Sequence, residues 1–71
     1  MPELRDLSGK EVIAILTREG FIVKRTQGSH TVLRRGNEVC VVPLHDELAL
    51  GTLRNVLRQA QISIEEFMEN K

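Results

Sequence analysis

Apolar side chains repeat at helical spacing near the start of the chain, in a stripe that one side of a helix would bury. The stripe comprises Val12, Ile13 and Leu16. Ser8 and Glu11 stand three residues apart, as in the capping box that begins many helices, and Gly20 can adopt the left-handed conformation that ends one. These signals predict a helix over residues 9–19.

Three runs rich in β-branched and aromatic residues follow, and such runs favour strands. They span residues 21–26, 30–35 and 38–42. Short turn-forming stretches, Gly28-Ser29 and Gly36-Asn37, separate the runs. Pro43 ends the third run because proline cannot donate a hydrogen bond to a sheet. The chain therefore predicts a three-stranded antiparallel meander.

A second helical stripe lies near the C-terminus and comprises Leu53, Val56, Leu57 and Ala60. Ser63 and Glu66 repeat the capping-box spacing, which predicts a short last helix ending near Glu69. This order predicts an α+β fold of two layers, a three-stranded antiparallel sheet with helices on one face (α-β-β-β-α plus a short C-terminal helix). The other face of the sheet stays open to solvent or a partner.

The strand over residues 30–35 offers two apolar anchors, Val32 and Leu33, which point to opposite faces of a sheet. The pattern alone leaves both orientations open. We favour Leu33 inward, which would place His30, Val32 and Arg34 together on the open face.

The composition, 41% hydrophobic and 28% charged over 71 residues, is typical of one small globular domain and excludes a low-complexity chain. The net charge is zero, but residues 1–35 carry seven basic and four acidic side chains, and the remainder carries three basic and six acidic ones. The stretch Lys24–Arg35 contains no acid. A local basic surface can therefore exist on a neutral protein.

The beginning of the chain lacks the apolar segment of a signal peptide, and no run approaches the ~20 apolar residues of a membrane span. Cys40, the sole cysteine, can form no intramolecular disulfide and is expected to fill space in the core. Two histidines without clustered carboxylates predict no metal site, and no cofactor-binding motif is present. We expect a cytoplasmic protein without cofactor or membrane contact.

His30 has the surroundings of a catalytic imidazole, because it follows Gly28 and Ser29 at a turn within the basic stretch. An imidazole can take a proton from a ribose 2′-hydroxyl while cations hold the phosphate and stabilise its developing charge. The candidate cations are Lys24, Arg25 and Arg34. The backbone of Gly28 and Ser29 can approach a phosphate closely. The same residues also fit a surface histidine beside an ordinary turn and a solvated basic strand.

Three further residues carry weaker signals. His45 could protonate the leaving 5′ oxygen, or it is a loop histidine bonded to backbone. Thr52 and Arg54 open the second helix, whose N-terminal N–H groups could receive a phosphate; the alternative is a solvated helix face. Because the chain has no tyrosine or tryptophan, RNA binding would depend on phosphate, ribose and shape contacts rather than base stacking.

Four short strings follow one another along the chain: Gly28-Ser29-His30, Pro43-Leu44-His45, the stretch from Gly51 to Ala60, and Ser63-Ile64-Glu65-Glu66-Phe67. In this order they resemble the HicA toxin family, and the resemblance extends from about Ser8 to Phe67. Gln61 departs from the family pattern, in which many members have glycine after Gln-Ala.

The resemblance implies a fold like that of double-stranded-RNA-binding domains, in a single HicA-like toxin domain over residues 1–71. It implies the toxin of a type II toxin-antitoxin system, an endoribonuclease that cuts mRNA without a metal and has His30 as its catalytic residue. It also implies a HicB-type antitoxin that covers the active face. Two alternatives share the fold: a noncatalytic RNA-binding module and a protein-interaction domain.

Overall fold

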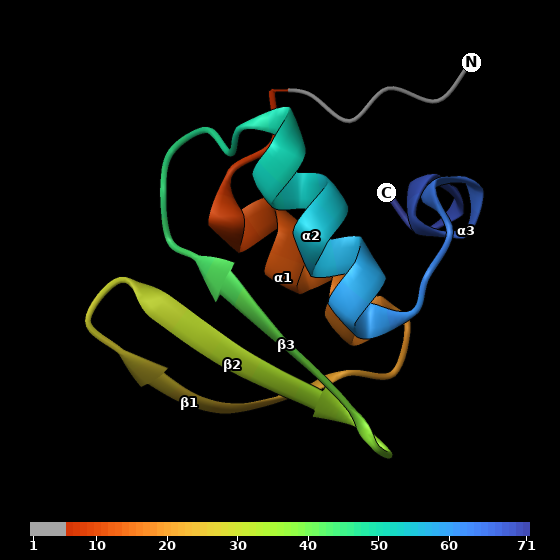
Figure 1. Ribbon diagram of the computed structural model, residues 1–71, viewed down its shortest axis with the longest axis horizontal. Helices are drawn as coiled ribbons and strands as arrows, with labels where there is room; N and C mark the ends of the chain where they lie inside the picture. The colour runs from red at the N-terminus through yellow and green to blue at the C-terminus, as the bar shows by residue number, and fades with distance from the viewer. Residues whose placement is uncertain (1–5) are drawn as a thin grey trace.

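Three antiparallel strands form one sheet in the computed structural model, which describes residues 6–71, and the helices pack on one face of that sheet (Figure 1). The elements in chain order are α1 (Gly9–Arg18), β1 (Ile22–Gln27), β2 (His30–Arg35), β3 (Glu38–Pro43), α2 (Leu50–Ala60) and α3 (Ile64–Glu69). This confirms the predicted two-layer α+β architecture. The first helix ends one residue earlier than the predicted range 9–19. The first strand begins and ends one residue later than the predicted range 21–26.

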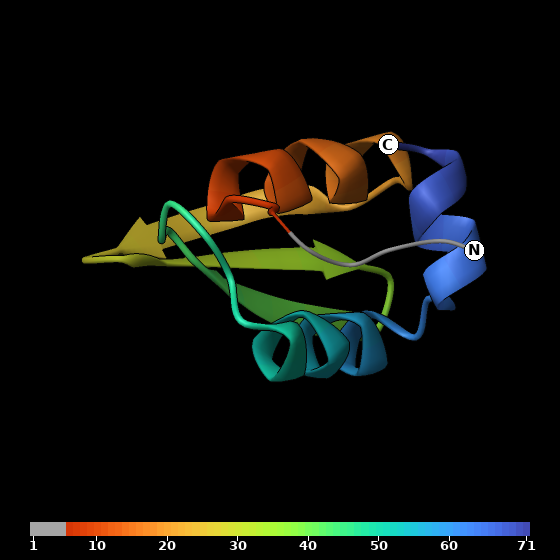
Figure 2. The same cartoon turned by 90° about the horizontal axis from the view of Figure 1, so that it is seen from above.

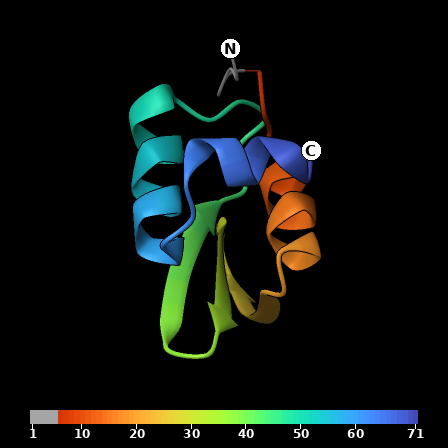
Figure 3. The same ribbon diagram turned by 90° about the vertical axis from the view of Figure 1, so that its right-hand side faces the viewer.

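Helices α1 and α2 share the covered face of the sheet, with α1 on the side of β1 and α2 on the side of β3 (Figure 2). Helix α3 crosses between them (Figure 3). The buried side chains of sheet and helices form one core: Leu7, Val12, Ile15, Leu16, Phe21, Leu33, Cys40, Val42, Leu48, Leu53, Val56, Leu57, Ala60, Ile62 and Phe67. Within residues 6–71, no helix has the length and apolar character needed to cross a membrane.

Helix α1 begins where its capping box predicts, and Gly20, the expected end signal, follows its C-terminus. The Ser8 Oγ accepts a hydrogen bond from the Glu11 N–H at 3.1 Å, and the Glu11 Oε1 accepts one from the Ser8 N–H at 2.9 Å. The bond from the Ser8 backbone, and then that from its side chain, hold the pKa of Glu11 below its usual range. Gly20 has a φ of +98°, which lets the chain turn from α1 into β1.

Strands β2 and β3 alternate regularly between the two faces of the sheet. Leu33 is fully buried, so the predicted inward orientation of this residue is confirmed. Thr31 is buried on the same face, and Cys40 and Val42 are its buried counterparts on β3. Because neighbours on a strand point to opposite faces, the residues between them form the open face.

Strand β1 contains a bulge at Lys24. Val23 pairs with Leu33, but the next pair joins Arg25 to Val32, so Lys24 is an extra residue without a partner on β2. The bulge restores the alternation one residue later and places Arg25, not only Lys24, on the open face. We use the name open face for the sheet surface opposite the helices, formed by Ile22, Lys24, Arg25, Gln27, His30, Val32, Arg34, Val39 and Val41.

The start of α1 lies directly against the end of β3. The Gly9 N–H donates to the His45 carbonyl at 2.9 Å. A Cβ at Gly9 would overlap the Pro43 carbonyl oxygen and approach the Leu44 Cα to 3.0 Å. Only glycine therefore fits between α1 and the β3–α2 connection.

Gly9→Ala should lower the free energy of unfolding by about 1–3 kcal/mol, because the added methyl must separate two backbone segments. Urea denaturation of the purified protein measures the change. Gly51→Ala is the matched control: a Cβ there meets nothing within 4 Å, and alanine favours a helix by about 1 kcal/mol over glycine. Equal stability of Gly9→Ala and the parent protein would contradict the close approach.

Gln61 caps the C-terminus of helix α2 and has a φ of 57°, in the left-handed region. Its N–H donates to the Arg58 carbonyl at 3.2 Å, and the Ile62 N–H donates to the Leu57 carbonyl at 3.1 Å. A residue with a Cβ is strained in this conformation, whereas glycine is not. The departure from glycine noted in the sequence therefore falls at the one place in this helix end where glycine fits best.

Gln61→Gly should raise the free energy of unfolding by about 0.5–1 kcal/mol, since relief of the strain exceeds the entropy that glycine adds to the unfolded chain. Thermal unfolding would show a melting temperature several degrees higher. Gln61→Ala keeps the strain and should show no gain, so an equal rise in both variants would disprove this cause.

Candidate functional site

His30 is the first residue of β2 and is exposed on the open face. It pairs with Gln27 on β1 and with Pro43 on β3. The turn before it is tight because Gly28 has a φ of +59°, and only Gly28 and Ser29 separate the two strands. The hairpin thus holds the His30 backbone firmly while it leaves the imidazole accessible.

The loop that carries His45 lies beside the same turn. The Leu44 N–H donates to the Ser29 carbonyl at 2.6 Å, and His45 is exposed one residue later. Its carbonyl accepts from Gly9, which fixes the backbone but leaves the ring outside the core. Both histidines of the chain therefore lie at one end of the sheet.

The candidate cations divide into two groups along the open face. Arg25 pairs with Val32, two residues from His30 along β2, and is exposed. Arg34 lies four residues from His30, and its Nε donates to the Gly36 carbonyl at 2.7 Å. This bond directs the Arg34 guanidinium toward the β2–β3 turn, away from His30.

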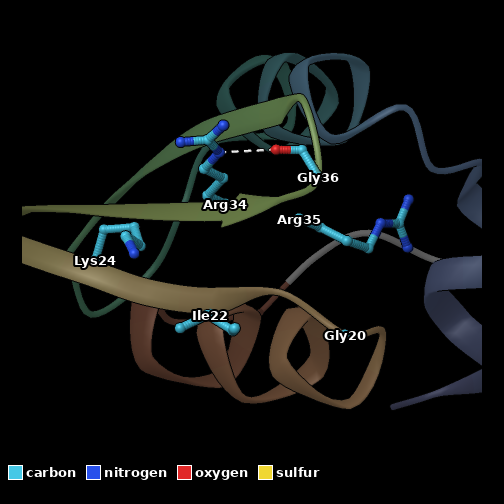
Figure 4. Close-up of a pocket in the computed structure, with 6 residues that line it drawn as sticks. All are labelled: Gly20, Ile22, Lys24, Arg34, Arg35 and Gly36. Carbon is cyan, nitrogen blue, oxygen red and sulfur yellow. Dashed lines mark hydrogen bonds between the residues drawn. The ribbon is translucent and has the colours of Figure 1, made fainter.

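A pocket of about 180 Å³ lies at that far end of the sheet and is lined by Gly20, Ile22, Lys24, Arg34, Arg35 and Gly36. Figure 4 shows Lys24 on β1 and Arg34 on β2 beside this pocket. In the described part of the chain, residues 6–71, neither of these two cations has a carboxylate partner.

Arg35, by contrast, stabilises the fold through contacts with other side chains. Its guanidinium lies 4.7 Å from the centre of the Phe21 ring and forms ion pairs with Glu19 at 3.8 Å and Glu38 at 3.4 Å. Burial, and then the neighbouring Glu66 carboxylate, raise the pKa of Glu19, while Arg35 opposes that rise. The charge of Arg35 is thus largely balanced within the fold.

The two candidates on α2, Thr52 and Arg54, do not lie on the open face. Thr52 is half-buried and Arg54 exposed, and both lie in the first turn and a half of α2, which packs on the covered face of the sheet. Gly28 is exposed at the tip of the β1–β2 hairpin, next to Ser29. The structure therefore brings together the hairpin, His30 and the His45 loop, and leaves the two α2 residues apart from them.

Exposed apolar side chains on the open face were not among the residues singled out from the sequence. Ile22 is 64% exposed, Val39 48% and Val41 36%. The alternation of Val39 and Val41 with buried Cys40 and Val42 is the sequence signal that could have identified two of them. The open face thus combines cations with exposed apolar side chains on its two edge strands.

Cys40 is fully buried, and burial raises the pKa of its thiol to about 11. It is therefore un-ionised at neutral pH and inert as a nucleophile. Within residues 6–71, no three His, Cys, Asp or Glu side chains gather into a group that could hold a metal ion.

The arrangement defines a class of small α+β domain that presents a histidine and exposed cations on the face of an antiparallel sheet opposite its helices. The family model described as the HicA toxin of bacterial toxin-antitoxin systems matches residues 9–62, which include every strand, α1 and α2. The chain therefore belongs to the HicA toxin family. A search of curated proteins finds no relative that matches this chain.

A thiol reagent such as iodoacetamide should modify Cys40 about 10²-fold more slowly in the native protein at pH 7 than in urea, because burial and a raised pKa both reduce the reactive thiolate. Mass spectrometry of timed samples measures the two rates. Since Cys40 is the sole cysteine, the signal needs no assignment. Similar rates in both conditions would show an accessible thiol and a core unlike the one described.

Proposed function

We propose that this toxin is an endoribonuclease that cuts mRNA without a metal, with His30 as the general base. The observation that supports the proposal most directly is the exposed imidazole at the start of β2, on a sheet face whose cations have no acidic partner within residues 6–71. Membership of a toxin family also supports the proposal, because a toxin must damage something that the cell needs, and RNA is such a polymer.

The reaction needs few groups. His30 accepts the proton of a ribose 2′-hydroxyl, the 2′ oxygen attacks the adjacent phosphorus, and the bond to the 5′ oxygen breaks. The leaving 5′ oxygen takes a proton from a general acid, for which His45 is the candidate at this end of the sheet, or from water. The products are a 2′,3′-cyclic phosphate and a free 5′-hydroxyl.

Cations stabilise the charge that develops on the phosphate. Arg25 lies closest to His30 along the strands and is the best placed of them. Lys24 and Arg34 extend the basic surface toward the far end of the sheet, and the backbone at Gly28 and Ser29 offers a close approach. Thr52 and Arg54, on α2, have at most a secondary role in this scheme.

A HicB-type antitoxin is the proposed partner of the open face. Ile22, Val39 and Val41 expose apolar surface beside the cations, a combination that suits an acidic, partly apolar protein surface. Such a partner would cover His30 and prevent RNA from reaching it. The proposal thus joins the activity and its control at one surface.

Partner-free protein should cleave labelled single-stranded RNA in the presence of EDTA, and His30→Ala should lower the rate by about 10²–10⁴-fold while remaining folded, because the ring is exposed. Gel electrophoresis measures the rates, and circular dichroism checks the fold. Product ends should carry 2′,3′-cyclic phosphate.

Other outcomes assign other functions. Salt-sensitive RNA binding without any cleavage would indicate a noncatalytic RNA-binding module, and the absence of both would indicate a protein-interaction domain. His45→Ala is the matched variant from the same end of the sheet: a loss of similar size would assign the leaving-group proton to His45. Unchanged cleavage by His30→Ala would refute the role of His30.

A further inference from the structure

The pocket at the far end of the open face is too distant from His30 to hold the phosphate that is cut. Lys24 and Arg34 line it, and Arg34 lies four residues from His30, about 13 Å at the rise of an antiparallel strand. The bond from Arg34 Nε to the Gly36 carbonyl keeps the guanidinium at this end. A single phosphate therefore cannot contact both the His30 imidazole and the Arg34 guanidinium.

Within residues 6–71, the donors in the pocket are free for an anion. Arg34 uses one of its five N–H donors on Gly36, and among these residues the others have no acceptor. Lys24 supplies three more from the bulge on β1. The side chain of Arg35 turns away from them and is balanced by Glu19 and Glu38, so it does not compete (Figure 4).

The pocket also has features that suit a nucleic-acid strand rather than an isolated anion. Ile22 forms an apolar wall and is 64% exposed, so a ribose or base can lie against it. Gly20 and Gly36 have no side chains to close the pocket. The pocket and His30 share one continuous sheet face, along which a strand with regularly spaced phosphates can run.

We infer that the pocket of Lys24 and Arg34 binds a backbone phosphate of the RNA substrate beyond the scissile one, and so sets the length of RNA that the toxin cuts efficiently. The inference rests on the proposed ribonuclease activity and deepens it. Cleavage at His30 then depends on a second contact about 13 Å away, which short substrates cannot make.

A length series of oligonucleotides with a single ribose among deoxyriboses tests this, since each then has one cleavable linkage. For the parent protein, kcat/KM should rise about tenfold or more once the oligonucleotide is long enough to reach the pocket, mainly through KM. In Lys24→Gln/Arg34→Gln the ratio of long to short substrate should fall close to one. The pair Lys24→Arg/Arg34→Lys keeps both charges and should retain most of the gain.

The control Lys10→Gln/Arg58→Gln removes the same two charges from exposed helical positions and should keep the full dependence on length. Binding of an all-deoxy oligonucleotide provides a readout without cleavage. Loss of this one phosphate contact should make the slope of log K against log salt less steep by about 0.7. Circular dichroism confirms that each variant is folded.

Each outcome separates the two proposals. If the parent protein cuts RNA with no dependence on length, or if the pocket variant keeps the full gain, the pocket inference is wrong and the ribonuclease proposal stands. If no RNA is cut but deoxy-oligonucleotide binding shows the expected change in slope, the pocket binds a strand and the catalytic proposal fails. If the pocket variant loses only antitoxin binding, the pocket serves a protein partner and the inference is overturned.

Discussion

Leu33, Cys40 and Val42 lie on one face of the sheet, and their burial against the helices constrains every other position on β2 and β3. Side chains on a strand alternate, so a shift of register by one residue would exchange the two faces completely. Burial of a leucine side chain contributes about 2 kcal/mol, and the exchanged register would bury His30 and Arg34 in its place. The exposure of the histidine is thus a consequence of the core.

The helices and the two faces of the sheet are the features that the sequence predicts. Capping residues and apolar periodicity locate the helices because both signals are local, and Ser8 with Glu11 forms the contacts that their spacing requires. The pattern along β2 left Val32 and Leu33 as alternative anchors, and the structure confirms the favoured inward orientation of Leu33, which pairs with buried Cys40 on β3. The open face, with His30 on it, could therefore be predicted once one residue was assigned to the core.

Features that depend on contacts between segments could not be predicted in this way. The bulge at Lys24 brings Thr26 opposite Thr31, and the two hydroxyl groups form a hydrogen bond at 3.1 Å. Strict alternation without the bulge would have turned Arg25 toward the helices. The direction of Arg34 depends on a carbonyl in the next turn. The bulge depends on how β1 pairs with β2, and the direction of Arg34 depends on the backbone geometry of the turn that follows it, so the pattern of residue types contains no signal for either.

The contrast between Arg34 and Arg35 explains how a protein of zero net charge can present a basic surface. The two residues are neighbours on β2 but point to opposite faces, and only Arg35 reaches the carboxylates of Glu19 and Glu38. The glutamates of α3 lie across the helical layer, and a Debye length of about 8 Å at physiological ionic strength screens them from the open face. A polyanion that approaches the sheet therefore responds to the local cations rather than to the total charge. Because those cations extend from Arg25 near His30 to Arg34 at the far turn, the surface favours an extended strand over a compact anion.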